Sequence, residues 1–207
     1  MKKAAVLALV LVLCALPVWG TDSEDILGEI DGSIYRNMVM GAEAKFGDKW
    51  RLLSREEIAA LAGAVSSTSP GVKEILEKNI PLFVAMAGGG IMNVNITIDS
   101  INDAGRALIA TSRDLFADLF MDRAAEGMKR SNEQQGLEDS VIKKITVRFL
   151  DEECPALSMT ATYRKVPMFQ KQVMFLTNNY IFNVTATSVA SDKTDEILSL
   201  FLKSDSN

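Results

Sequence analysis

Strict alternation of apolar and polar residues is the feature that most limits what this chain can fold into. Between Met92 and Asp99 every second residue is apolar, and the residues between are asparagine, threonine or aspartate. Successive side chains of a strand point to opposite faces, so this pattern predicts a β-strand that is buried on one face. Four more segments in the last third of the chain are expected to form strands: residues 142–150, 157–164, 170–176 and 180–187.

Shorter strands are expected in the first half of the chain. Residues 33–39 and 42–46 lie on either side of Gly41, and residues 81–87 precede the run Gly88–Gly90. Because that run leads into another strand, we interpret it as a hairpin turn rather than as a phosphate-binding loop. Strands that follow one another through short turns predict antiparallel pairing.

Helices are expected between and after these strands. Leu108, Leu115 and Leu119 recur at helical spacing, which predicts one long amphipathic helix over residues 103–130. Ser54 followed by Glu57 is a capping box, which predicts the start of a short helix that ends near Gly63. Two further helices are expected over residues 72–79 and 192–201.

These elements predict an α+β fold in which helices cover a mostly antiparallel central sheet. No proline-rich linker, low-complexity tract or repeat of fixed period divides the chain. We therefore expect a single domain over residues 34–204, preceded by an acidic N-terminal linker over residues 21–33.

The first twenty residues have the pattern of a secretory signal peptide. Lys2 and Lys3 precede an unbroken apolar run over residues 4–15, and cleavage is expected after Gly20. A membrane span needs about 20 apolar residues, so this run is too short for a transmembrane anchor. Cys14 lies inside the run and follows a leucine, which argues against a lipid attachment site. The protein is therefore expected to be secreted or periplasmic.

The absence of histidine excludes several kinds of chemistry. A Ser-His-Asp triad, a Cys-His dyad, a His-ligated zinc site and imidazole acid–base catalysis are all impossible. The chain has 22 basic and 27 acidic residues, a net charge of −5, and no dense basic patch. These features argue against nucleic acid as a partner.

The remaining candidates for chemistry each have a simpler structural interpretation. The acidic residues 151–153 could bind Ca²⁺, but three consecutive carboxylates at a turn converge poorly on one ion. Cys154 has acidic neighbours, which raise the pKa of a thiol, so we interpret it as a structural cysteine, with an intermolecular disulfide left open. Asn95 and Asn183 begin glycosylation sequons inside predicted strands, and we interpret both as strand residues. The ten methionines are interpreted mainly as core residues.

Three stretches resemble the PsbP-like family: residues 34–57, residues 93–98, and residues 170–187 with the helix after them. The resemblance covers about residues 34–203, although the family often has a proline before the tryptophan that is Trp50 here. It implies an α/β/α sandwich with a central antiparallel sheet. It also implies a role in binding a protein partner or supporting an assembly, as for PsbP of photosystem II and a Ran-binding nuclear transport factor.

The sequence therefore predicts an exported, non-catalytic binding or accessory domain that acts through a protein partner of the envelope or secreted fraction, as a monomer or weak oligomer. No pattern identifies catalytic, metal-binding or partner-binding residues, and no cofactor is expected. One alternative is an envelope carrier of a small ligand or lipid, with a cavity lined by Phe116, Phe120 and methionines. A second alternative is a hydrolase that uses carboxylates, which predicts a pair of acids with raised pKa in a cleft.

Overall fold

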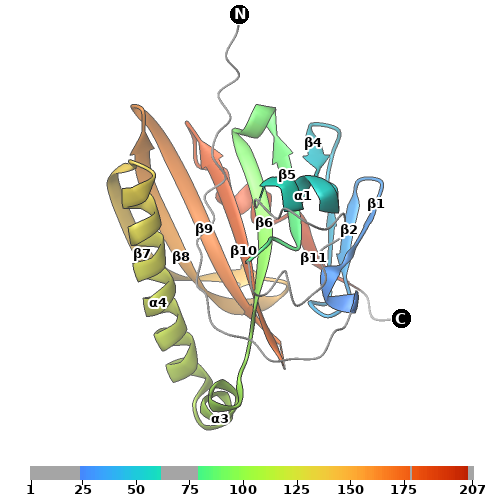
Figure 1. Ribbon diagram of the computed structural model, residues 1–207, viewed down its shortest axis with the longest axis vertical. Helices are drawn as coiled ribbons and strands as arrows, with labels where there is room; N and C mark the ends of the chain where they lie inside the picture. Colours follow the sequence, from blue (N-terminus) through green and yellow to red (C-terminus); the bar gives the residue numbers. More distant parts are fainter. Residues whose placement is uncertain (1–23, 62–78, 178, 205–207) are drawn as a thin grey trace, which may run out of the picture.

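The computed structural model describes residues 24–61, 79–177 and 179–204, and its largest element is a seven-stranded sheet (Figure 1). All neighbouring strands of this sheet pair antiparallel. In spatial order, the strands are β4 (Trp50–Leu52), β5 (Phe83–Ala87), β6 (Met92–Ser100), β10 (Tyr180–Val189), β9 (Val166–Leu176), β8 (Glu152–Tyr163) and β7 (Glu138–Phe149).

A smaller, four-stranded antiparallel sheet brings together the beginning and the end of the described chain. Its strands, in spatial order, are β1 (Glu29–Asp31), β2 (Ile34–Asn37), β3 (Ala42–Lys45) and β11 (Phe201–Lys203). Strand β11 pairs with β3, with Phe201 opposite Ala44. The predicted closing helix over residues 192–201 is therefore shorter than expected: α5 (Thr194–Leu198) ends early, because Phe201 continues as a strand of this sheet.

The expected α+β fold with antiparallel sheets is confirmed. Helix α4 (Arg113–Gln134) runs along β7 and β8 on one face of the large sheet, and α3 (Asp103–Thr111) lies beyond one end of α4 (Figure 1). On the opposite face, residues of the small sheet and of α5 share one core with the large sheet. Within the described residues, no helix is long and apolar enough to cross a membrane.

The single helix expected over residues 103–130 is wrong, because the chain breaks at Ser112 into α3 and α4. The backbone N–H of Ser112 donates to the carbonyl of Leu108 at 2.7 Å, and its hydroxyl accepts from the N–H of Leu115 at 3.3 Å. The backbone at Ser112 is extended, with φ −160° and ψ 96°. One serine thus ends the first helix and caps the second, while the leucine spacing continues across the break.

The face of the large sheet that packs against the small sheet, which we call the apolar face, is lined by aliphatic and aromatic side chains. Phe83 and Phe182 are both 0% exposed. The ring of Tyr35 from β2 stacks on Phe83 with 4.2 Å between centroids. Phe201 of β11 contacts Phe149 of β7 at 5.8 Å between centroids. These contacts join the two sheets into one core.

The opposite face, which we call the polar face, is also buried in the centre of the sheet. Asn93, Asn95 and Asp99 of β6 are only 6%, 3% and 8% exposed. The expectation that this strand is buried on one face only is therefore wrong. Alternation shows which residues share a face, but it does not show whether the polar face meets water.

Two other local expectations change in the structure. Part of the predicted linker is structured, because residues 24–31 form a 3₁₀ turn (Glu24–Leu27) and β1, and the side chain of Ile26 is 0% exposed. The turn expected over residues 151–155 is tighter, since Leu150 and Asp151 both have positive φ and β8 already begins at Glu152. The predicted signal peptide, and the predicted helix over residues 72–79 apart from Asn79, lie outside the described residues.

Candidate functional site

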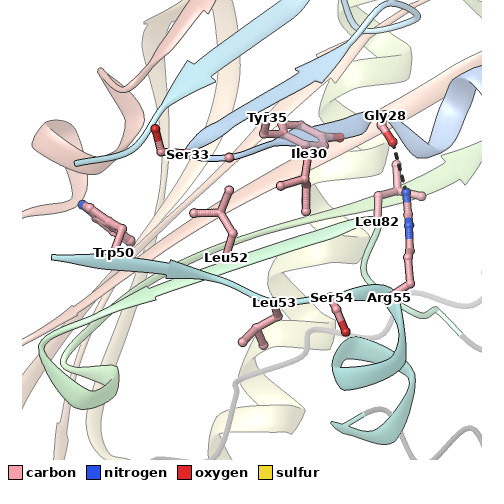
Figure 2. Close-up of a pocket in the computed structure, with 11 residues that line it drawn as sticks. Gly28, Ile30, Ser33, Tyr35, Trp50, Leu52, Leu53, Ser54, Arg55 and Leu82 are labelled. Atoms are coloured by element: carbon pink, nitrogen blue, oxygen red, sulfur yellow. Dashed lines mark hydrogen bonds between the residues drawn. The ribbon is translucent and has the colours of Figure 1, made fainter. Parts of the chain in front are cut away.

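A cleft of about 530 Å³ lies between β1 and β4 (Figure 2). Strand β1 is the outermost strand of the small sheet, and β4 is the outermost strand of the large sheet. Each strand therefore has one edge without a neighbouring strand among the described residues. The backbone N–H and C=O groups along such an edge are available to pair with an added strand.

Apolar side chains form the walls and the floor of this cleft. Ile30 of β1 and Leu52 of β4 point toward each other across it, and Trp50 lies farther along β4 (Figure 2). Ile30 is 43% exposed, although it is a large aliphatic residue. Tyr35 and Leu82 line the floor and are buried. A ligand in the cleft would therefore cover apolar surface that now faces solvent.

The start of helix α1 (Arg55–Leu61) closes one end of the cleft. The capping box expected at Ser54 is confirmed: its hydroxyl accepts from the N–H of Glu57 at 3.3 Å, and the carboxylate of Glu57 accepts from the N–H of Ser54 at 2.9 Å. This local structure fixes the first residue of the helix, Arg55, whose side chain extends toward Gly28 (Figure 2).

Within the described residues, the Arg55 guanidinium contacts backbone carbonyls and forms no ion pair with a carboxylate. Its Nη2 donates to the backbone carbonyls of Leu27 and Gly28, and among the described residues no carboxylate oxygen lies within 4.0 Å of it. Its Nη1 is buried without an acceptor in that part of the chain. Burial lowers the pKa of Arg55 below its usual value, but a guanidinium stays charged at neutral pH. Among the described residues, this end of the cleft therefore carries a positive charge that pairs with backbone carbonyls and forms no ion pair with an acidic side chain.

Gly28 and Tyr35 fix the shape of the cleft beside this charge. Gly28 has φ +66°, and a Cβ at that position would lie 2.6 Å from the carbonyl oxygen of Arg36. The Tyr35 hydroxyl accepts a hydrogen bond from Asn37 Nδ2 at 3.0 Å. Burial raises the pKa of Tyr35 to about 12, so the phenol is neutral at physiological pH. The neutral Tyr35 hydroxyl therefore supplies no negative charge to Arg55.

A second unusual region lies on the polar face, where strands β6, β10 and β9 lie side by side. The strand register places Asn93, Thr187 and Gln170 in one row across the three strands. It places Asn95, Thr185 and Gln172 in the next row. We call these six residues the polar island. Their exposed fractions are all 6% or less.

Among the described residues, the two glutamines of the polar island make few side-chain hydrogen bonds for their degree of burial. Gln172 Nε2 donates to Asn183 Oδ1 at 3.4 Å, whereas Gln172 Oε1 is buried without a partner. Both amide atoms of Gln170 are also buried without a partner in the described part of the chain. A buried polar group left unpaired costs about 1–3 kcal/mol of stability. The island therefore contributes less to stability than an apolar surface of the same shape.

Asp99 lies at the border of the polar island and continues its hydrogen bonding. Asn183 Nδ2 donates to the Asp99 carboxylate at 2.8 Å. Burial raises the pKa of Asp99 to about 6, against the opposing effects of the Asn183 hydrogen bond and of Arg123. The partner of this acid is an amide, whereas the hydrolase alternative expects a second carboxylate beside the acid with the raised pKa.

The residues expected for a lipid carrier are divided between two places. Phe116 and Phe120 line a small pocket of about 250 Å³ beside α3, together with Leu108 and Leu119. Drug-sized ligands usually occupy pockets of about 300–1,000 Å³. The methionines near α4, among them Met128 and Met159, fill the core between that helix and the sheet and do not line this pocket.

The other residues considered from the sequence have structural positions. Cys154 is buried in β8, and burial, with a smaller effect of Glu152, raises the pKa of its thiol to about 11. This agrees with a structural cysteine. Asn95 and Asn183 of the two sequons are both 3% exposed. Among the described residues, no three acidic or cysteine side chains are grouped so that they could hold a metal ion.

Comparisons with solved structures give distant likenesses, of which LpqN is one. No protein-family model matches the chain, and no curated protein sequence matches it. A crystal structure of LpqN, described as involved in cell envelope biogenesis of Mycobacterium tuberculosis, is similar over 76% of this chain and 75% of LpqN. The sequence identity is 15% and the TM-score is 0.35. A likeness at this level supports no conclusion about function, and membership of the PsbP-like family stays a prediction.

Sequence reasoning missed both regions. The Ser54–Glu57 capping box located Arg55 at a helix start, but nothing in the sequence shows that its guanidinium donates to the backbone carbonyls of Leu27 and Gly28. The alternation of β6 did place Asn93 and Asn95 on one face. A count of polar residues facing that way from all three adjacent strands would have found the polar island, had the strand register been known.

Proposed function

We propose that the protein is an exported, non-catalytic accessory domain that binds an extended segment of a protein partner in the cleft between β1 and β4. The observation that carries this proposal is the cleft between β1 and β4, two strands that each have one edge without a neighbouring strand among the described residues. A peptide that adds to a sheet edge gains affinity from backbone hydrogen bonds, and pockets between the strands select its side chains.

The side chains of the cleft support a segment of particular chemistry. Ile30, Leu52 and Trp50 favour an apolar residue in the partner, because their contact with it removes apolar surface from water. Arg55 favours an acidic group of the partner at the closed end of the cleft. Export to the envelope or the medium is proposed from the signal-peptide pattern of residues 1–20.

Site-specific photo-crosslinking in the native envelope and secreted fractions tests this proposal. A photoreactive amino acid replaces Ile30 in one variant and Leu202 in the control variant. Leu202 is 65% exposed and lies on β11, at the opposite edge of the same small sheet. We expect one discrete product from position 30 and none from position 202. No product at position 30, or the same products at both positions, contradicts the proposal.

A further inference from the structure

We propose that β7 of the large sheet pairs antiparallel with β7 of a second copy of this chain, which gives a two-fold symmetric dimer. Strand β7 is the outermost strand of the large sheet, at the end opposite β4, and most of its residues are exposed (Figure 1). The inference does not rest on the proposed protein partner, which uses the edges of β1 and β4. It rests on the outward backbone groups of β7, on the cavities beside it and on the order of its side chains.

The outer edge of β7 presents backbone groups that pair with no strand among the described residues. A two-residue turn, Leu150–Asp151, joins β7 to β8; both of its residues have positive φ, and Phe149 lies opposite Glu152. In such a hairpin the two residues that flank the turn exchange hydrogen bonds, and bonded pairs alternate along the ladder. From residue 141 to residue 149, the odd-numbered residues therefore bond to β8, and the even-numbered residues direct their N–H and C=O groups outward.

The position of Pro155 in β8 supports this assignment. It lies opposite Thr146 and has no N–H to donate, so these two residues do not exchange a pair of hydrogen bonds. Thr146 therefore directs its backbone groups to the open edge. Residues 142, 144 and 148 share this orientation, which provides a continuous row of donors and acceptors for a second strand.

Cavities lie beside β7 on both faces of the sheet. The larger, of about 550 Å³, is on the apolar face, where Ile145, Val147 and Phe149 line it together with Leu198 and Phe201. The smaller, of about 290 Å³, is lined by residues of β7, β8 and α4. Because side chains of a strand alternate between the two faces, a strand added to β7 places them over both cavities in turn.

The apolar side chains of β7 match this edge when a second copy is turned antiparallel. Val141 is 49% exposed, although it lies on the apolar face, four residues before Ile145. In an antiparallel pair the first half of one strand runs beside the second half of the other, so Val141 of one copy lies toward the larger cavity of the other. The two-fold symmetry forms this contact twice, because both copies use the same patch.

The charges of β7 favour the same orientation. Glu138 and Asp139 begin the strand, whereas Lys143 lies near its middle and Arg148 near its end. An antiparallel copy brings the acidic beginning of one strand toward the basic end of the other, whereas a parallel copy places like charges together.

The lysines of β7 restrict which strand can be added. Lys144 is directed to α4, where its Nζ lies 2.6 Å from Asp122 Oδ1 and 3.7 Å from Asp118 Oδ1. Lysines on an edge strand discourage unspecific pairing, so an added strand needs acidic residues at matching positions. This chain itself supplies them at the beginning of β7.

The test measures self-association of the full-length mature protein by sedimentation velocity, at concentrations from about 1 μM to about 1 mM. Thr146→Pro removes one outward N–H and leaves the hydrogen bonds to β8 intact. Val141→Glu places a charge where the second copy makes contact, at a side chain that is exposed in a single copy. The matched control is Val166→Glu on β9, two strands away from β7, where the valine is 39% exposed.

We expect a concentration-dependent dimer in the wild type and in Val166→Glu, and association at least about tenfold weaker in both β7 variants, with circular dichroism showing that each is folded. Amide hydrogen exchange of the wild type is a second readout. The N–H groups of Lys144 and Thr146 become protected as concentration rises, while that of Ile145 is protected throughout because it bonds to β8. A wild type that stays monomeric, whatever other protein binds β7, or a dimer that forms equally well in both β7 variants, overturns the proposal.

Discussion

The apolar and polar faces of the large sheet are built from the same central strands, β6, β10 and β9. Their buried side chains nevertheless contribute differently to the stability of the protein. On β10, Phe182 and Val184 point to the apolar face and are 0% exposed. Thr185 and Thr187 point to the polar face and are 6% and 3% exposed. Both faces are buried, but only one of them has side chains that need nothing beyond close packing.

This difference separates the part of the sheet that stabilises the protein from the part that does not. Burying one large apolar side chain contributes about 1.5–3 kcal/mol. An unpaired buried amide costs a similar amount. Leucine or methionine in place of Gln170 would therefore give a more stable domain.

The largest expected loss of stability comes from removing a large side chain from the apolar face. Phe83→Ala removes a ring that stacks on Tyr35 and contacts Phe46 at 5.4 Å between centroids. We expect the free energy of unfolding to fall by about 3–5 kcal/mol, because the change leaves a cavity between the two sheets. Denaturant unfolding followed by circular dichroism measures this loss. Met38→Ala, at a site that is 73% exposed, is the control and should change stability by less than about 0.5 kcal/mol.

The apolar face is also the part of the molecule that the sequence predicted best. Alternation over residues 92–99 identified β6 and showed that Met92, Val94, Ile96 and Ile98 share one face, and the strand expected over residues 180–187 is part of β10. The signal was reliable because strand geometry enforces a period of two whatever the tertiary context. The small sheet itself could not be foreseen, since β11 pairs with β3 across most of the chain.

The polar face and the cleft could not be predicted for a physical reason. Whether Asn95 meets water, whether Gln170 has a partner and whether Arg55 has a carboxylate nearby all depend on contacts between distant segments. Local patterns carry no information on such contacts. The break at Ser112 was missed for a different reason: its hydroxyl competes for backbone hydrogen bonds without altering the leucine spacing.

The next largest effect is expected at Asp99, at the border of the polar island. The carboxyl has a pKa of about 6 in the folded protein, against an ordinary value of 3.8. The folded state therefore holds a proton more tightly than the unfolded state, and the free energy of unfolding falls as pH rises from about 4 to about 6. Above that range the ionised, buried Asp99 costs up to about 3 kcal/mol.

Asp99→Asn should remove most of this loss, because the amide oxygen can still accept from Asn183 and carries no charge. We expect the variant to be more stable than the wild type at pH 7 and similar to it at pH 4. Urea unfolding across this pH range provides the measurement. Asp118→Asn, at a side chain that is 73% exposed on α4, serves as the control. An Asp99→Asn variant with the same pH dependence as the wild type would show that another group causes it.

A smaller gain in stability is expected from Gln170→Met, which replaces a buried polar side chain of the polar island with an apolar one. We expect the free energy of unfolding to rise by about 1–3 kcal/mol, because two polar atoms without a partner among the described residues are removed from a buried site. Thermal unfolding of the wild type, Gln170→Met and the control Gln134→Met, at the exposed end of α4, measures this gain. A loss of stability in Gln170→Met alone would show that the amide is paired in solution.

The smallest and most discriminating change is Thr187→Val, which removes one hydroxyl from the polar island and keeps the shape of the side chain. Thr187 is 3% exposed, and its strand position favours a β-branched residue in either form. We expect a gain of about 0.5–1 kcal/mol over the control Thr160→Val, at an exposed position of β8. If Thr187→Val instead lowers the free energy of unfolding, its hydroxyl already has a partner. The polar face would then be as well satisfied as the apolar face, and the contrast between the two faces would no longer hold.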